Sequence, residues 1–136
     1  MKILIVDDDR AVSDFFAHVA RVHGHEEIDT VSSGEEALTQ VLRRDYDLIT
    51  LDIRMPGLSG LEIVALLRTT CPHAVIAIIS GFIPDEVPGE VAGCADVLLA
   101  KPVGTTVFSQ LLDGVEEISR TLTRVRGLGT PLPRAR

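Results

Sequence analysis

Long apolar runs are missing from this 136-residue sequence, and so is the layered N-terminus of a secretory signal. The first absence argues against a membrane span and the second against secretion. Cysteine is scarce, and the two that occur, Cys71 and Cys94, form neither a metal-ligand pattern nor a disulfide framework. No internal repeat, low-complexity tract or interdomain linker divides the chain. These absences favour a cytoplasmic protein built around one core.

Basic residues are also scarce over most of the chain. Residues 1–119 carry all 20 acidic residues and 8 of the 13 basic ones, whereas residues 120–136 carry five arginines and no acid. Nonspecific affinity for nucleic acids comes from basic contacts to phosphates, so the acidic body argues against direct nucleic-acid binding. In the basic tail, 120–136, glycines and prolines predict the end of a helix followed by disorder. This tail is either a solubilising end or an arm that docks a partner.

Short apolar runs alternate with stretches of helical periodicity. The predicted strands are rich in Val, Ile and Leu, and they are Ile3–Val6, Glu27–Val31, Leu48–Leu51, Val75–Ile79 and Val97–Ala100. Most lack a clean period of two, as expected for strands buried on both faces. The first helix is predicted by Val12, Phe15, Phe16, Val19 and Val22, and the last by a stripe of Phe108, Leu111, Leu112, Val115, Ile118 and Leu122. The alternation predicts an α/β doubly wound fold with a parallel sheet covered on both sides.

Helix boundaries also leave a signal in the sequence. Ser33–Glu36 and Ser59–Glu62 match the capping box with which helices begin. The stretch expected to form the fourth helix, 82–93, contains Pro84, which could open a helix, and Pro88-Gly89, which would break it after one turn. We therefore expect a fourth helix that is short, displaced or mobile.

Polar residues follow four of the five predicted strands, and they are Asp7, Asp8, Asp52, Ser80 and Lys101. Each has an ordinary structural explanation. Asp8 or Asp9 could cap the first helix, and Asp52 could start a turn. Ser80-Gly81 could be a plain turn, and Lys101 an exposed charge. In an open parallel sheet, however, the carboxyl ends of the strands form the edge where ligands bind, so all of these residues are expected together.

The chemistry of this set fits phosphoryl transfer to a carboxylate. Three ionised carboxylates repel one another, so a divalent cation is needed, and Mg²⁺ suits oxygen ligands. A carboxylate beside a cation can act as a nucleophile toward phosphorus, which gives Asp52 the attacking oxygen. Lys101 and the Ser80 hydroxyl can bind phosphoryl oxygens, and Gly81 leaves room for the incoming group.

The ordered motifs make the resemblance specific. They are Ile5-Val-Asp-Asp-Asp9, Leu51-Asp-Ile-Arg-Met-Pro-Gly57, Ile79-Ser-Gly81 and Lys101-Pro102. Over residues 1–119 the chain resembles the receiver domain of bacterial two-component response regulators. This resemblance implies a flavodoxin-like (βα)5 sandwich with a five-stranded parallel sheet in the order 2-1-3-4-5.

The resemblance also implies roles for individual residues. Asp52 would accept a phosphoryl group from the phosphohistidine of a sensor histidine kinase or a histidine phosphotransfer protein. Asp7, Asp8, Asp52 and the backbone carbonyl of Arg54 would hold Mg²⁺. Ser80 and Lys101 would couple phosphorylation to a change of surface that a downstream protein target reads. The resemblance also allows a dimer through the face of the fourth helix, fifth strand and fifth helix. Such a domain assists its own phosphorylation and dephosphorylation but is not an enzyme.

Some positions depart from the family pattern. Many members carry an aromatic residue three positions before the lysine, where this chain has Leu98, so the usual aromatic switch is in doubt. Arg54 and Phe82 occupy positions where the family varies its dephosphorylation rate. Both side chains are large, and we expect them to limit the access of hydrolytic water.

Two other functions fit these residues less well. A flavodoxin-like FMN electron carrier shares the architecture, but Asp7, Asp8 and Asp9 would repel the flavin phosphate. A phosphatase with an aspartyl nucleophile needs a second acid two residues later, where this chain has Arg54. The sequence predicts either a single-domain regulator or the N-terminal receiver of a longer, for example transcriptional, regulator.

Overall fold

The computed structural model describes residues 1–58, 60–82, 85, 89–130 and 132. Its elements, in chain order, are β1 (Lys2–Val6), α1 (Arg10–Val22), β2 (Glu27–Val31), α2 (Gly34–Arg43), β3 (Leu48–Leu51), α3 (Gly60–Thr70), β4 (Val75–Ser80), α4 (Gly89–Ala92), β5 (Val97–Ala100) and α5 (Thr105–Arg126). The strands form one parallel sheet in the order β2-β1-β3-β4-β5. The predicted fold and strand order are confirmed, and two strands differ by one residue, since β1 begins at Lys2 and β4 ends at Ser80.

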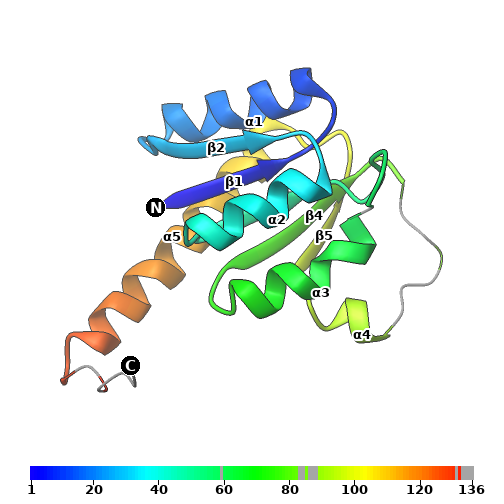
Figure 1. The fold of residues 1–136 in the computed structure, drawn as a ribbon. Coiled ribbons are helices and arrows are strands. Elements are labelled where there is room, and N and C mark those ends of the chain that lie inside the picture. The colour runs from blue at the N-terminus through cyan, green and yellow to red at the C-terminus, as the bar shows by residue number, and fades with distance from the viewer. Residues whose placement is uncertain (59, 83–84, 86–88, 131, 133–136) are drawn as a thin grey trace.

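Helices cover both faces of the sheet (Figure 1). In β1, Ile3 and Ile5 pack in the core beneath α1 and α5, whereas Leu4 and Val6 pack in the core beneath α2 and α3. Every residue of the central strand β3 is buried. Two-sided burial is the reason for the continuous apolar runs in the sequence.

Side-chain caps fix two of the helix starts. Asp9 caps α1 by accepting a hydrogen bond from the backbone N–H of Ala11 at 3.0 Å. Ser33 caps α2 by accepting from the N–H of Glu36 at 3.2 Å. The Glu36 carboxylate reaches back to the N–H of Ser32 at 3.3 Å, one residue before the cap. The capping box predicted at Ser59 lies outside the described residues.

The fourth helix is short, as predicted, and α4 spans the four residues Gly89–Ala92. Its start differs from the expectation, because Gly89 begins the helix and was predicted to break it. The predictions for Pro84 and Pro88 lie outside the described residues. The predicted mobility of this region remains a prediction.

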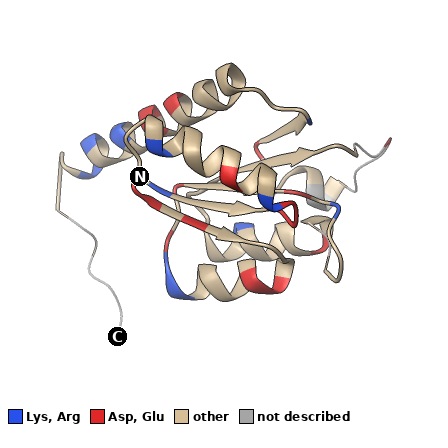
Figure 2. Cartoon of the chain, turned by 90° about the horizontal axis from the view of Figure 1, so that it is seen from above, with Lys and Arg blue, Asp and Glu red and all other residues tan. Residues whose placement is uncertain are grey.

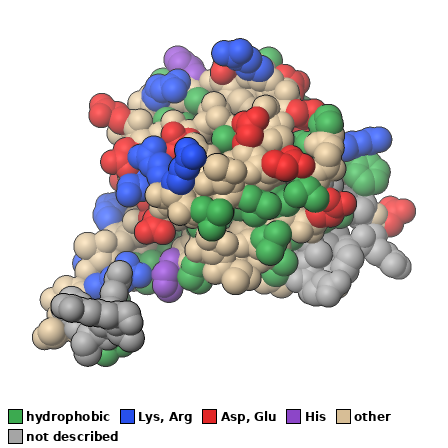
Figure 3. Space-filling view, viewed as in Figure 1, with side chains coloured by type: hydrophobic (Ala, Val, Ile, Leu, Met, Phe, Trp, Pro, Cys, Tyr) green, Lys and Arg blue, Asp and Glu red, His purple; other side chains and the backbone are tan. Residues whose placement is uncertain are grey.

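The helical stripes expected from the sequence are buried only in part. Phe15 and Val22 of α1 and Ile118 of α5 are exposed, because the sheet covers a narrower face of each helix than the stripe occupies. Hydrophobic side chains also gather on the face formed by α2 and α3 (Figure 3), where Leu42 and Leu66 are exposed. Among the described residues, no helix has the length and apolar character that crossing a bilayer requires.

Candidate functional site

Three carboxylates meet at the carboxyl edge of the sheet, as the sequence predicts. Asp7 and Asp8 follow β1, and Asp52 follows β3, the strand beside it. One carboxylate oxygen from each lies within 4.8 Å of the other two. Asp7 and Asp52 are buried, while Asp8 is exposed. The cluster therefore has a buried floor and one side open to solvent.

The Asp52 carboxylate is held by donors from three parts of the chain. Its Oδ1 accepts hydrogen bonds from the Ser80 hydroxyl at 3.0 Å and from the Arg54 backbone N–H at 3.0 Å. Its Oδ2 lies 3.2 Å from the Lys101 ammonium. These donors fix the orientation of the Asp52 carboxylate. The alternative that Asp52 only starts a turn does not explain its contacts with Ser80 and Lys101.

Ser80 and Lys101 join this cluster from the ends of β4 and β5. The Ser80 side chain is fully buried, and its hydroxyl also accepts from the N–H of Phe82 at 3.2 Å. Lys101 places its ammonium 2.7 Å from Asp7 Oδ2, in addition to its contact with Asp52. The alternatives of a plain turn at Ser80 and of an isolated exposed charge at Lys101 are therefore wrong.

The electrostatics of the cluster follow from burial and from the single lysine. Burial raises the pKa of the Asp7 carboxyl, although its hydrogen bond and charge interaction with Lys101 act in the opposite direction. Burial alone would lower the pKa of Lys101, but hydrogen bonds to and charges on Asp7 and Asp52 outweigh it and raise the pKa. Lys101 thus stays charged at neutral pH. One ammonium among three carboxylates leaves negative charge in excess, which attracts a cation.

The donor set fits a hard divalent cation. All three side chains offer carboxylate oxygens, which Mg²⁺ prefers, and Mg²⁺ binds oxygen at about 2.0–2.1 Å. In octahedral geometry, neighbouring ligands of one ion are therefore about 2.9 Å apart and opposite ligands about 4.1 Å apart. The oxygens of Asp7, Asp8 and Asp52 all lie within 4.8 Å of one another, so a small inward movement of the side chains would let them bind one ion. The part assigned to the Arg54 carbonyl remains a prediction.

The structure adds two residues that sequence reasoning missed. The buried Ser13 of α1 donates its hydroxyl to the backbone carbonyl of Asp7 at 3.3 Å, which ties the first helix to the site. Gly60 begins α3 so close to β3 that an added Cβ would lie 2.7 Å from both the Asp52 carbonyl oxygen and the Ile53 Cα. Glycine at a helix start is a weak signal that could have pointed to this close approach. Nothing in the sequence distinguishes Ser13 from an ordinary helical serine.

Two large side chains lie together beside the cluster. The Arg54 guanidinium carbon is 5.0 Å from the centroid of the Phe82 ring, within the range of a cation–π contact. At the neighbouring Gly81, an added Cβ would meet no atom of the described residues within 4 Å. Leu98, where an aromatic residue is usual, is 40% exposed on β5.

The fold and this site agree with the comparisons to known proteins. Residues 3–113 match the model of the response regulator receiver domain family, and the chain belongs to that family. The family is one of signalling phosphoacceptors in two-component systems and not of conventional enzymes. This membership favours the phosphoacceptor interpretation over a flavin carrier.

Several characterised relatives are longer proteins. Transcriptional regulatory protein TcrA of Mycobacterium tuberculosis is 32% identical over 136 residues, which cover 98% of this chain and 49% of TcrA. Transcriptional regulatory protein HprR of Escherichia coli is 36% identical over 113 residues, covering 82% of this chain and 48% of HprR. Response regulator protein FleR of Pseudomonas aeruginosa is 33% identical over 100 residues, or 72% of this chain and 21% of FleR. The chain thus spans at most about half the length of these relatives.

Solved structures share the fold. A CheY-like receiver domain protein from Methanospirillum hungatei superposes with a TM-score of 0.80 at 23% identity, covering 88% of this chain and 97% of that one. Response regulator TrrA from Thermotoga maritima, solved in complex with Mg(2+)-BeF, gives a TM-score of 0.72 at 33% identity, covering 87% and 99%.

Proposed function

We propose that Asp52 accepts a phosphoryl group from the phosphohistidine of a sensor histidine kinase or histidine phosphotransfer protein. The observation that carries the proposal is the Asp52 carboxylate itself, buried at the sheet edge among two further acids, one hydroxyl and one ammonium. The Mg(2+)-BeF complex of TrrA, 33% identical to this chain, supports a site of this kind.

In the proposed step, an Asp52 carboxylate oxygen attacks phosphorus and the phosphorus–nitrogen bond of the donor breaks. The electron pair of that bond goes to the imidazole nitrogen, which takes up a proton. Asp7, Asp8, Asp52 and the Arg54 carbonyl would hold Mg²⁺, which would offset the negative charge of the carboxylates and the phosphoryl oxygens. Ser80 and Lys101, now bonded to Asp52, would turn their donors to the phosphoryl oxygens.

Ser80 and Lys101 would also couple phosphorylation to a change at the protein surface. Ser80 bonds both Asp52 and the N–H of Phe82, so a shift of its hydroxyl toward a phosphoryl oxygen would draw on the chain after β4. A charge-assisted hydrogen bond contributes about 1.5–3 kcal/mol, which is enough to shift the equilibrium between two surface conformations of similar free energy. A downstream protein would read that change in the cytoplasm.

The test is phosphorylation of the purified protein by acetyl phosphate, followed as intact mass with and without Mg²⁺. We expect a gain of one phosphoryl group that requires Mg²⁺ and is lost in Asp52→Asn. As a matched control, Asp14→Asn removes an exposed acid of α1 and should retain the gain. An unchanged gain in Asp52→Asn would place the phosphoacceptor elsewhere.

A further inference from the structure

The loop that follows Asp52 supplies backbone groups to the acidic cluster. We define the β3–α3 loop as residues 53–58. The N–H of Arg54 donates to Asp52 Oδ1 at 3.0 Å, and the Arg54 carbonyl is the proposed fourth protein ligand of Mg²⁺. Unlike a side chain, a backbone ligand has no rotamers by which it can adjust to an ion. The position of the loop therefore sets where this ligand lies.

The first part of the β3–α3 loop is held by the sheet and the core. Ile53 is buried, and its carbonyl accepts a hydrogen bond from the Gly60 N–H at 3.3 Å. Met55 is also buried and packs in the core beneath α2 and α3. Gly57 then turns the chain with a φ of +78°, a left-handed conformation that glycine adopts without strain. Beyond this turn the loop needs a different support.

That support is the start of α2, which contacts both polar groups of the Leu58 backbone. The Glu35 carboxylate accepts a hydrogen bond from the Leu58 N–H at 3.3 Å. An added Cβ at the buried Gly34 would lie 2.8 Å from the Leu58 carbonyl oxygen, so only glycine lets the helix start this close to the loop. An added Cβ at Gly57 would lie 3.0 Å from Glu35 Oε1. Glu35 thus lies against two consecutive residues of the loop.

The Glu35 carboxylate is separate from the cap of α2, which Ser33 and Glu36 form. The first turn of α2 is acidic and its last turn is basic, as Figure 2 shows, and this order suits the helix dipole. The backbone N–H groups of Glu35 itself and of Leu58 lower the pKa of the Glu35 carboxyl. At neutral pH the side chain that accepts from the loop is therefore ionised.

Pro56 links the turn at Gly57 to the acidic cluster. Its ring fixes its φ at about −65°, which removes one of the torsions that could absorb a movement of the loop. The neighbouring Met55 is buried and has little room to move. A displacement of Gly57 would therefore be passed on to the backbone of Arg54.

We propose that Glu35 is a positioning residue for the Mg²⁺ site, because its contacts with Leu58 and Gly57 hold the β3–α3 loop where the Arg54 carbonyl can bind the ion. Glu35 itself touches neither the ion nor the phosphoryl group. This inference rests on the proposed function, which gives the Arg54 carbonyl its role. Without Glu35 the three carboxylates of the cluster remain in place, so Mg²⁺ binding should become weaker without being lost.

The test is an NMR titration of the full ¹⁵N-labelled protein with Mg²⁺, in the absence of any phosphodonor. We expect Glu35→Ala to raise the Kd for Mg²⁺ by about threefold or more, since groups that orient metal ligands influence affinity. Glu35→Gln keeps an oxygen that can accept from the Leu58 N–H, and it should restore most of the affinity. If the charge of Glu35 alone attracted the ion, both variants would bind equally weakly, and the proposal would be overturned.

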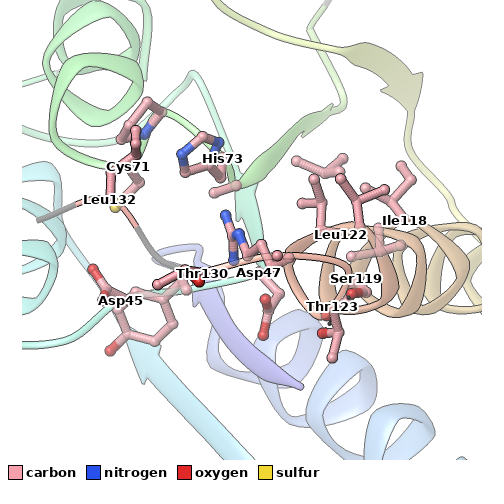
Figure 4. A pocket seen from close by; sticks show the side chains of 18 residues that line it. Asp45, Asp47, Cys71, His73, Ile118, Ser119, Leu122, Thr123, Thr130 and Leu132 are labelled. Atoms are coloured by element: carbon pink, nitrogen blue, oxygen red, sulfur yellow. Dashed lines mark hydrogen bonds between the residues drawn. The ribbon is translucent and has the colours of Figure 1, made fainter.

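Two further variants control for net charge and for helix stability. Asp45→Ala removes an exposed acid before β3, at the opposite edge of the sheet, where Asp45 lines a cavity beside α5 (Figure 4), and it should leave the Kd unchanged. Glu36→Ala removes an acid from the same turn of α2 and part of its cap, so it should lower the melting temperature and leave the Kd unchanged. A rise in Kd as large in Glu36→Ala as in Glu35→Ala would overturn the proposal, because Glu35 would then act only through the stability of α2.

Hydrogen exchange separates positioning of the loop from a purely local contact. In Glu35→Ala we expect faster exchange at the Leu58 amide, which loses its acceptor, and also at the Arg54 amide, which bonds Asp52. Faster exchange at Leu58 alone, with an unchanged Kd, would overturn the inference and leave phosphorylation of Asp52 standing. If the natural protein bound no Mg²⁺, both the inference and the proposed function would be wrong.

Discussion

Lys101 decides the charge balance of the acidic cluster. Its ammonium lies within 3.2 Å of both buried carboxylates, Asp7 and Asp52, and their charges raise its pKa despite burial. Buried carboxylates are tolerated only when paired, so this lysine allows the two acids to lie side by side before any phosphoryl group arrives. The third acid, Asp8, forms no salt bridge with any residue that the structure describes, and it faces solvent.

Asp8 therefore offers a test of repulsion in the cluster. Asp8→Ala should raise the melting temperature of the metal-free protein, because one of three converging charges is removed. The same variant should gain less stability than the natural protein when Mg²⁺ is added. Thermal melts with and without Mg²⁺ measure both effects. Asp14→Ala, which removes an exposed acid away from the cluster, should keep the full Mg²⁺ response, and equal Mg²⁺ shifts in all three proteins would rule the idea out.

Phe82 and Arg54 bear on how long the phosphorylated state lasts. Because the ring and the guanidinium lie together beside the site, we expect them to hinder hydrolytic water. Phe82→Ala should therefore increase the dephosphorylation rate several-fold, measured as the decay of phosphorylated mass after donor removal. Phe15→Ala, which truncates an exposed phenylalanine of α1, should leave the rate unchanged. A slower decay in Phe82→Ala would show that the ring promotes hydrolysis.

His25 adds a pH dependence to stability. Burial lowers the pKa of His25 from its ordinary value of 6.5, and the N-terminal amine and His23 act in the same direction against Glu116 and Asp113. Below about pH 6.5, His25 of the unfolded chain takes up a proton that the folded protein does not bind. The free energy of unfolding therefore decreases as the pH is lowered from about 6.5 toward the pKa of His25 in the folded protein. Above about pH 6.5 this contribution does not change with pH.

We therefore expect His25→Leu to lose less stability than the natural protein between about pH 7 and pH 5. The buried Nε2 of His25 lies 4.0 Å from Glu116 Oε2 and has no hydrogen-bond partner among the described residues, so leucine breaks no hydrogen bond there. Denaturant melts across this range measure the slope, and His18→Gln, at an exposed position of α1, serves as control. A slope in His25→Leu as steep as in the natural protein would count against the assignment.

Among the elements, α2 shows how local sequence fixes a boundary. Ser33→Ala removes the oxygen that accepts from the Glu36 N–H, and should lower the free energy of unfolding by about 1 kcal/mol. Thr39→Ala also removes a hydroxyl from α2, but places a better helix former in the helix interior, and should cost nothing. Chemical denaturation compares the two, and equal losses would show that the cap contributes nothing specific.

Elements were predictable where one periodicity dominates. The buried strands β1, β3 and β4 read as continuous apolar runs, and all five strands were located to within one residue, although β2 contains Glu27 and Asp29 and β5 is only partly buried. The helical stripes were less informative, because periodicity shows which side of a helix is apolar but not how much of that side the sheet covers. Ile118 belongs to the stripe and still lies in solvent. The start of α4 at Gly89 was missed for a related reason, since glycine and proline mark both ends of helices.

At the scale of the whole molecule, topology assembles the site. Asp7, Asp52, Ser80 and Lys101 lie at the carboxyl ends of four neighbouring parallel strands, and the strand order places them on one edge of the sheet. That is why the members of the cluster could be predicted from the sequence. The supporting contacts of Ser13 and Gly60 could not be predicted, because they depend on how closely α1 and α3 approach the sheet and the loop after it.

The central claim is that the phosphoryl group resides on Asp52. After phosphorylation by acetyl phosphate with Mg²⁺, borohydride reduces an aspartyl phosphate to homoserine, which marks its position permanently. Peptide mass spectrometry should then find homoserine at position 52 and aspartate at positions 7 and 8. Homoserine at another position, or a phosphoryl group that survives reduction on a serine or histidine, would contradict the account.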